Sequence, residues 1–317
     1  RERLVKTAES VARVATARRT RAAGQLLLLV TLAFVLVRVR SIWHDSSIDL
    51  AGVDWWALIG ALLIAAAGVA ASAFIWLVIL ERLGLRTRPR WVSIFFQAQL
   101  AKYIPGSVWQ YAGRAALARR WGLPMRPVAI SMPVELGASI AAGVIVSALL
   151  LGWWGILIVA AALLICVLAA RPLERTGIRW RRELAVAGSV VPLYAAAWVV
   201  IGASFWLTAD ALLSVPASEF PFYVGAFVAS WIVGLIAIYA PGGIGVRESV
   251  MVALLYSRIG SGNALAVAAV SRAMLTLIDV GFAGVAFLFL RRSDQSSLGP
   301  DATRTPVPSE PREPVAP

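Results

Sequence analysis

Seven ionisable side chains stand inside stretches of this sequence that are otherwise apolar enough for a membrane. They are Lys102, Arg114, Glu135, Arg247, Glu248, Arg272 and Asp279. An ionisable group without a partner in hydrocarbon costs several kcal/mol, so such groups usually mark a path for ions or polar substrates. Four cations against three anions leave one positive charge over, and that balance suits an anionic head group.

Three of these charges belong to two short stretches with one outline, YIPGSVWQYAGR (103–114) and YAPGGIGVRE (239–248). A Pro-Gly turn leaves free N–H groups at the start of the helix that follows, and the helix dipole favours an anion there. The glycines after Pro241 would let a phosphate approach the backbone closely. Arg247, one turn after Gly243, could bind that phosphate with two parallel hydrogen bonds.

We therefore expect the two stretches to form halves of one substrate site. The first half would use Lys102, Tyr103, Pro105, Gly106, Trp109, Gln110 and Arg114. The second half would use Pro241, Gly242, Gly243, Gly245, Arg247 and Glu248. Glu135, Arg272 and Asp279 would join them from the segments that follow each turn.

A structural interpretation of the same residues stays open. The glycines could serve only close helix packing, and the charges could pair with one another, Glu135 with Arg114 or Arg272 with Asp279. Glu248 is adjacent to Arg247, so the two cannot face the same way on a helix. Glu248 could instead hold a cation from the other half of the chain. Ser271, Gln97 and Gln99 are weaker candidates, better explained as contacts between helices.

The composition places these charges in an all-α polytopic membrane protein. Of 317 residues 60% are hydrophobic and only 15% are charged, with a mean hydropathy of +0.78. The net charge of +13 would suggest nucleic acid in a soluble protein. Here the cations stand in the gaps between apolar runs, where orientation in a bilayer explains them. One cysteine and one histidine exclude an intrachain disulfide and a His-rich metal cluster.

Six apolar runs are predicted as spans, and all but the first, which is shorter, are about long enough to cross roughly 30 Å of hydrocarbon. They cover 23–37, 55–80, 128–151, 153–170, 184–207 and 264–290. Eight of the 13 tryptophans fall at their predicted ends, at the headgroup level that an indole prefers. A basic amphipathic segment, 1–22, precedes this membrane domain of 23–290, and a polar, Pro-rich tail, 291–317, is expected to be disordered.

The positions of Lys and Arg predict how the two Pro-Gly stretches cross. If 91–118 and 222–256 are re-entrant hairpins, 23 cations lie in cytoplasmic segments and three lie outside. If each stretch crossed once, the distribution would be 15 against 11. The positive-inside rule favours re-entrant hairpins, with both termini cytoplasmic. The units 55–151 and 184–290 then form an inverted repeat.

The motifs KYIPGSVWQYAGR, YAPGGIGVRESV and SRAMLTLIDVG, together with the span of Glu135, resemble the flippase-like integral membrane family. This family includes the membrane domain of lysylphosphatidylglycerol synthetases. The resemblance covers nearly all of residues 20–290 and implies a lipid flippase-like protein of the bacterial inner membrane with two re-entrant elements. It does not extend to an aminoacyl-transferase domain, so lysine transfer is not expected.

Two kinds of function compete. The first is a transporter that moves the head group of an anionic lipid or lipid-linked saccharide from one turn to the other while the tails stay in lipid. The second is an enzyme or accessory subunit of glycosyl transfer to a polyprenyl phosphate, working with glycosyltransferases, with Glu135 as the base. The sequence contains no catalytic signature and indicates no cofactor, so we favour the transporter.

The orientation gives a first testable prediction. Cysteines introduced at Ser218 and Ser261 are expected to react with an impermeant reagent added to intact cells, because the second hairpin enters from outside. A cysteine at Ser293 is expected to stay unlabelled, because the tail is cytoplasmic. The unsubstituted chain, with Cys166 alone, is the control. Labelling at Ser293 in intact cells would contradict this orientation.

Overall fold

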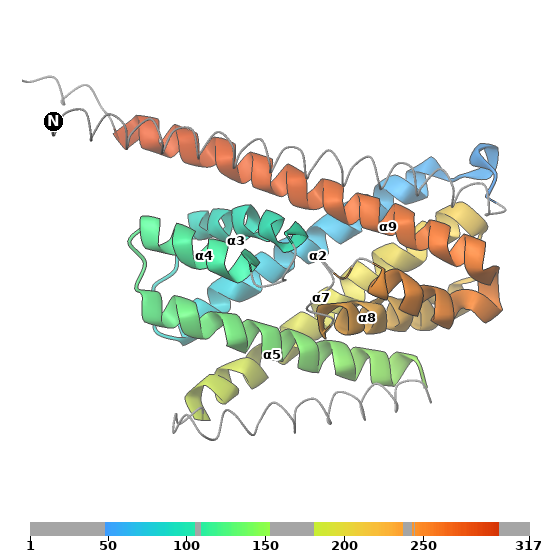
Figure 1. The fold of residues 1–317 in the computed structure, drawn as a ribbon, viewed down its shortest axis with the longest axis horizontal. Coiled ribbons are helices and arrows are strands. Elements are labelled where there is room, and N and C mark those ends of the chain that lie inside the picture. The colour runs from blue at the N-terminus through green and yellow to red at the C-terminus, as the bar shows by residue number, and fades with distance from the viewer. Residues whose placement is uncertain (1–47, 105–108, 153–180, 237–242, 244, 298–317) are drawn as a thin grey trace, which may run out of the picture.

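The computed structural model describes residues 48–104, 109–152, 181–236, 243 and 245–297, and within them the chain is helical, without a strand (Figure 1). The long helices are α2 (Trp55–Arg82), α5 (Met125–Leu150), α7 (Arg181–Leu213), α8 (Phe220–Ile236) and α9 (Val246–Ser297). The shorter ones are α3 (Val92–Gln99) and α4 (Trp109–Arg120), with the 3-10 turns η1 (Leu50–Gly52), η2 (Pro89–Trp91), η3 (Leu100–Tyr103) and η4 (Ala217–Glu219).

Five described helices are long and apolar enough to cross a membrane, which agrees with an all-α multi-pass membrane protein. They are Trp55–Arg82, Met125–Leu150, Arg181–Leu213, Ala217–Leu235 and Val246–Leu288. Four of the six expected runs, 55–80, 128–151, 184–207 and 264–290, fall on these helices to within two residues. The other two, 23–37 and 153–170, lie outside the described residues, as does the segment 1–22.

Both Pro-Gly stretches join two helices, as the sequence predicts. The first runs from α3 through η3 to α4, and these helices pack against each other. The second runs from α8 into α9, whose helical geometry is interrupted at Gly260 (φ 75°, ψ 164°). The first part of α9, 246–259, therefore returns along α8, and the remainder is the last long apolar helix. By length and composition α8 also qualifies as a spanning helix, whereas the sequence interpretation makes it one limb of a hairpin.

In each hairpin a residue just before the first helix contacts a residue near the end of the second. Arg90, just before α3, lies over the ring of Trp121, just after α4, at 5.7 Å. In the second hairpin Arg258 forms an ion pair with Glu219, just before α8, and lies 3.6 Å from the centre of the Phe222 ring. The two ends of each helix pair thus lie close together.

The hairpins pack reciprocally. Helix α3 of the first hairpin lies against α9, which contains the last apolar helix of the second half, and the Phe96 and Phe282 rings are 4.6 Å apart. Helix α8 of the second hairpin lies against α5, the last apolar helix of the first half. Helices α2 and α7 pack together along their lengths. Figure 1 shows this crossed arrangement, with α9 beside α3 and α5 beside α8.

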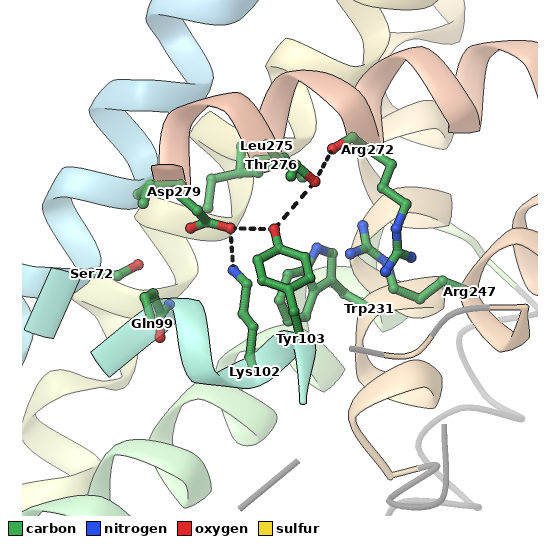
Figure 2. Close-up of a pocket in the computed structure, with 12 residues that line it drawn as sticks. Ser72, Gln99, Lys102, Tyr103, Trp231, Arg247, Arg272, Leu275, Thr276 and Asp279 are labelled. Carbon is green, nitrogen blue, oxygen red and sulfur yellow. Dashed lines mark hydrogen bonds and ion pairs between the residues drawn. The ribbon is translucent and has the colours of Figure 1, made fainter. Parts of the chain in front are cut away.

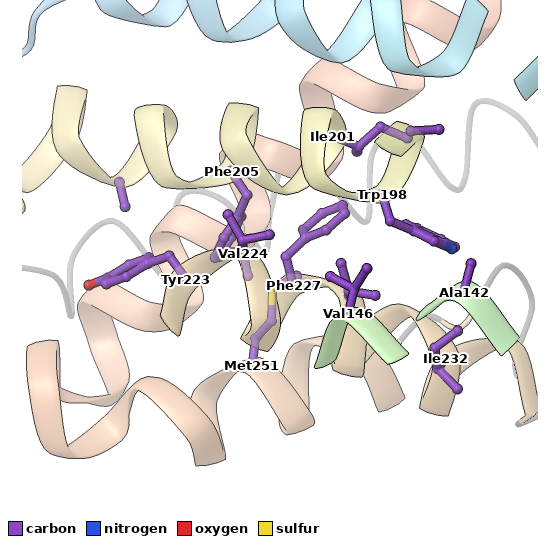
Figure 3. Packing of buried hydrophobic residues seen from close by; sticks show 14 of the residues in the cluster. Ala142, Val146, Trp198, Ile201, Phe205, Tyr223, Val224, Phe227, Ile232 and Met251 are labelled. Carbon is purple, nitrogen blue, oxygen red and sulfur yellow. The ribbon is translucent and has the colours of Figure 1, made fainter. Parts of the chain in front are cut away.

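The main hydrophobic core lies between α2, α5, α7, α8 and α9, and part of it is shown in Figure 3. Phe205 of α7 packs against Phe227 of α8 with ring centres 5.4 Å apart. Small residues allow these helices to approach. A Cβ on Gly143 of α5 would lie 2.5 Å from Ile232 of α8, which is closer than carbon atoms can pack. Bare glycine surfaces of this kind are typical of helix contacts in membranes.

The C-terminal boundary differs from the expectation. The sequence places disorder from residue 291, but α9 continues to Ser297. A helix that is already nucleated extends at little cost, since each added residue contributes a backbone hydrogen bond. The polar residues after Arg291 therefore continue the helix for a short distance, and 298–317 lie outside the described residues.

Two glycines of α7 give a matched test of the packing. A Cβ on Gly202 would lie 2.7 Å from a side-chain carbon of Val224 and 3.1 Å from its Cα, whereas a Cβ on Gly188 would meet nothing within 4 Å. Gly202→Ala is expected to destabilise the protein by about 1–3 kcal/mol through overpacking. Gly188→Ala is expected to be neutral or slightly stabilising. Thermal unfolding of the two variants in one detergent checks this, and equal stability would contradict the α7–α8 contact.

Candidate functional site

A cavity of about 90 Å³ lies where the first hairpin, α8 and α9 meet α2 and α7 (Figure 2). It is lined by Val69, Ser72, Gln99, Lys102, Tyr103, Ile201, Trp231, Arg247, Arg272, Leu275, Thr276 and Asp279. Both halves of the chain contribute to it. The volume has room for several water molecules, since one water occupies roughly 30 Å³ in the liquid. An anionic group of similar size would also fit.

One side of the cavity is a closed polar network around Asp279. This carboxylate, only 2% exposed, forms an ion pair with Lys102 in which Nζ and Oδ2 are 2.6 Å apart. The Tyr103 hydroxyl donates to the same Oδ2 at 2.7 Å and lies 3.2 Å from the hydroxyl of Thr276. Figure 2 shows these groups converging from the first hairpin and α9. The network ties η3 to the last long helix.

A second ion pair joins the two parts of α9. Arg272 Nη1 lies 2.6 Å from Glu248 Oε1, and Glu248 Oε2 accepts a hydrogen bond from the Gly245 backbone at 2.7 Å. The pairing of Arg272 with Asp279, which the sequence left open, is wrong. Seven residues on one helix separate their backbones by about 10 Å. The suggestion that Glu248 holds a cation of the other half is wrong too, because its partner Arg272 lies on α9, in the same half of the chain.

The third pair, Arg114 with Glu135, lies away from the cavity. Arg114 is 1% exposed and donates from both ends of its fork to the Glu135 carboxylate. Its guanidinium lies 4.3 Å from the centre of the Phe95 ring and 5.1 Å from that of Trp76. This arrangement bears out the structural interpretation of Arg114 and Glu135, since neither residue lines the cavity. The pair fixes α4 to α5.

Arg247 is the remaining charge, and among the described residues it has no carboxylate partner. It is 7% exposed and lines the cavity. Its guanidinium lies 4.4 Å from the centre of the Trp231 ring and 5.4 Å from that of Phe227. Its Nε and the Nε1 of Trp231 are buried donors without an acceptor in the described part of the chain. A desolvated cation–π contact contributes about 2 kcal/mol, less than the cost of burying an unpaired charge.

The backbone around Arg247 is shaped by two glycines. A Cβ on Gly234 of α8 would collide with Cγ of Arg247. Gly243 has φ +70°, and a Cβ on it would lie 3.2 Å from Cα of Gly234. The turn therefore packs directly on bare α8 backbone, and Arg247 lies along the same gap toward the cavity. Only glycine fits both positions, one because of the close approach and one because of its positive φ as well.

The structure brings together five of the predicted site residues around the cavity: Lys102, Tyr103, Arg247, Arg272 and Asp279. Gly243 lies against Arg247, Glu248 pairs with Arg272, and Gly245 donates to Glu248, but none of the three lines the cavity. Trp109, Gln110, Arg114 and Glu135 do not line it, and Trp109 is exposed. Pro105, Gly106, Pro241 and Gly242 lie outside the described residues. The expected two-part site is thus asymmetric, because the first hairpin contributes to the cavity mainly through Lys102 and Tyr103.

Sequence reasoning missed three neighbours of the charges: Trp231, Gly234 and Thr276. Trp231 had a usable signal, because it is not one of the eight tryptophans at predicted span ends and therefore needs another role. Gly234 and Thr276 give no such signal in a single sequence. Gln99, a weaker candidate in the sequence, does line the cavity, and its Oε1 is buried without a described partner.

The lining of the cavity could bind an anion. The cavity offers guanidinium and indole donors next to a carboxylate already neutralised by Lys102 and Tyr103. Within the described residues no group of three or more His, Cys, Asp or Glu side chains could hold a metal ion. No family model, no curated protein and no solved structure matches the chain.

The pair of Arg114 with Glu135 is largely buried, whereas the pair of Arg258 with Glu219 is partly exposed. This difference gives a prediction. Glu135→Gln leaves Arg114 buried without its counter-ion and is expected to destabilise the protein by about 3–5 kcal/mol. Replacing Arg114 by Met in the same chain is expected to recover most of that loss. Glu219→Gln, in a pair with about a third of each side chain exposed, is the matched control and is expected to cost at most about 1 kcal/mol. Thermal unfolding checks all three, and equal losses for Glu135→Gln and Glu219→Gln would contradict the buried pair.

Proposed function

We propose that this chain is a lipid flippase-like transporter of a bacterial inner membrane. It moves the head group of an anionic lipid or lipid-linked saccharide through the cavity between the two hairpins, while the acyl or prenyl tails stay in the bilayer. The single observation that carries the proposal is Arg247, a buried guanidinium that lines the cavity without a described counter-ion.

The charge balance supports an anionic substrate. Six of the seven ionisable residues at membrane depth form three ion pairs. Arg247 is the positive charge left over. An unpaired charge in an apolar interior is tolerated where a ligand compensates it during function. A phosphate fits, because the guanidinium fork binds it with two charge-assisted hydrogen bonds and the buried indole N–H of Trp231 is a further donor.

The size of the cavity supports movement of the head group alone. A volume of about 90 Å³ accommodates a phosphate-sized group, which is far smaller than a whole lipid. A tail that remains in lipid needs no polar path, so only the charged group requires compensation during crossing.

The re-entrant topology is part of the proposal. Helix lengths support it, because α4 and the 246–259 part of α9 measure about 18 Å and 21 Å, less than the roughly 30 Å of hydrocarbon. The contacts of Arg90 with Trp121 and of Arg258 with Glu219 support it too, since each hairpin closes at the level where it began. Broken helices at membrane depth are tolerated where they line a polar cavity.

An inverted repeat is proposed on two grounds. The first limb of each hairpin packs on the last helix of the other half. The second limb of each hairpin is joined by an ion pair to the helix that follows it, Arg114 with Glu135 and Glu248 with Arg272. In the first pair the hairpin limb carries the arginine and the following helix the glutamate, and in the second pair the two are exchanged. The two pairs occupy corresponding places in the fold. An axis in the membrane plane relates such units.

The flippase-like family remains our proposed assignment, and it rests on the motifs of the two turns. The alternative, an enzyme or accessory subunit of glycosyl transfer to a polyprenyl phosphate, needs a carboxylate free to act as base. Glu135, Glu248 and Asp279 are each ion-paired. Transport therefore has the better support, with cytoplasmic termini and an anionic lipid as the partner.

Arg247 provides the test. Arg247→Lys keeps the charge and loses the fork, so lipid translocation in reconstituted vesicles is expected to fall about tenfold, equivalent to roughly 1.4 kcal/mol. Arg247→Ala is expected to abolish translocation nearly completely, with the thermal stability unchanged or raised, because an unpaired buried charge has been removed. Arg258→Ala, at the exposed end of the second hairpin, is the matched control and is expected to transport normally.

Two outcomes would contradict the proposal. Wild-type translocation by a stable Arg247→Ala protein would show that no phosphate binds there. A strong loss of stability in Arg247→Ala, recovered when a nearby acid is also removed, would show that Arg247 serves as a structural counter-ion instead.

A further inference from the structure

In the second hairpin the Glu248 carboxylate binds donors that could otherwise bind an anionic ligand. Its Oε2 accepts from the Gly245 backbone N–H at 2.7 Å, at the start of α9, and its Oε1 accepts from Arg272 at 2.6 Å. A helix N-terminus and a guanidinium are the two kinds of donor that bind phosphate. In this structure the chain supplies its own carboxylate to both.

The Glu248 carboxylate neutralises only one of the two arginines of this region, because Arg247 forms no ion pair with a described residue. Arg247 and Arg272 both line the cavity and their like charges interact. Glu248 pairs with Arg272 and is not among the lining residues. Arg247 is 93% buried by its 7% exposure and has no described acceptor. One cation is therefore neutralised from within, and one is left for a ligand.

The charges around the cavity can be counted. Lys102, Arg247 and Arg272 are cations, and Asp279 and Glu248 are anions. The sum is one positive charge. A ligand with a single negative charge neutralises it, whereas a second negative charge meets the carboxylates of Glu248 and Asp279 without a cation to balance it. Without Glu248 the sum would be two positive charges.

We propose that Glu248 is a tethered anion that restricts this site to head groups with one negative charge. It occupies Arg272 and the helix N-terminus, so that only Arg247 is open to the ligand. The inference rests on the proposed function and deepens it, because it assigns the charge of the accepted head group to one side chain. The ligand class is a phosphodiester rather than a phosphomonoester or a diphosphate.

Glu248→Gln is the informative variant. The amide keeps an oxygen that accepts from the Gly245 N–H, so the start of α9 stays capped, but the negative charge is lost. Two short-chain lipids are the probes: phosphatidylglycerol, a phosphodiester with one charge, and phosphatidic acid, a phosphomonoester with roughly 1.5 to 2 charges at pH 7. Binding to the purified full-length chain in neutral detergent is measured by titration, with phosphatidylcholine as the zwitterionic control.

The wild-type chain is expected to bind phosphatidylglycerol about tenfold more tightly than phosphatidic acid, because close like charges repel in a site of low dielectric. In Glu248→Gln the preference is expected to reverse, through a gain of about tenfold or more for phosphatidic acid. Glu219→Gln, which removes an exposed carboxylate at the far end of the hairpin, is the matched control and is expected to keep the wild-type ratio. An unchanged ratio in folded Glu248→Gln would overturn the inference and leave Glu248 a structural cap.

A double variant covers the case in which Glu248→Gln does not fold. Glu248→Gln with Arg272→Gln removes both charges of the pair and keeps the sum at one positive charge. It is expected to retain the wild-type preference for phosphatidylglycerol, and a preference for phosphatidic acid would overturn the inference. If the wild-type chain and Arg247→Ala bind both lipids equally weakly, the proposed function fails instead, so the two failures are distinguishable.

Discussion

A charge removed from water must find a partner, and this constraint determines how the helices around the cavity meet. The ion pairs of Asp279 with Lys102, Glu135 with Arg114 and Glu248 with Arg272 each join segments that hydrophobic contact alone would leave free to slide. In a membrane the apolar surfaces of helices gain little from meeting, because lipid is as apolar as they are. Buried polar pairs and close packing at glycines therefore carry the specificity of the fold.

Because buried charges need partners, Arg247 is informative as the one described charge at membrane depth without an ion pair. Arg247 lies over the rings of Trp231 and Phe227, packs against Gly234 of α8, and lines the cavity without forming an ion pair with a described acid. Its acidic sequence neighbour, Glu248, is turned away to Arg272 and Gly245 because adjacent residues on a helix face different directions. The proposed anion site and the proposed charge limit on its ligand both follow from this separation of two consecutive residues.

The two hairpins share a plan but not a function in the proposed site. In the first, Arg114 after the turn forms an ion pair with Glu135, and Lys102 and Tyr103 before the turn line the cavity. In the second, the arginine after the turn remains open, and the acid beside it takes the structural role. In the first half the hairpin supplies the arginine of the ion pair, and in the second half it supplies the glutamate. The arginine of the second hairpin is therefore left without an ion pair. This asymmetry gives the proposed path a positive centre on one side only.

The sequence by itself determined that the chain is helical and apolar enough for a membrane, where four of its long helices lie, and which ionisable residues stand in its apolar stretches. These properties are local, since hydropathy, helix period and Pro-Gly breaks act over a few residues. It also fixed the surplus of one positive charge, which is a matter of counting. Only the tertiary structure decided which charge is the surplus one. Partners such as Lys102 and Asp279 are 177 positions apart along the chain, and their pairing depends on how α3 packs against α9, a contact that no local pattern encodes.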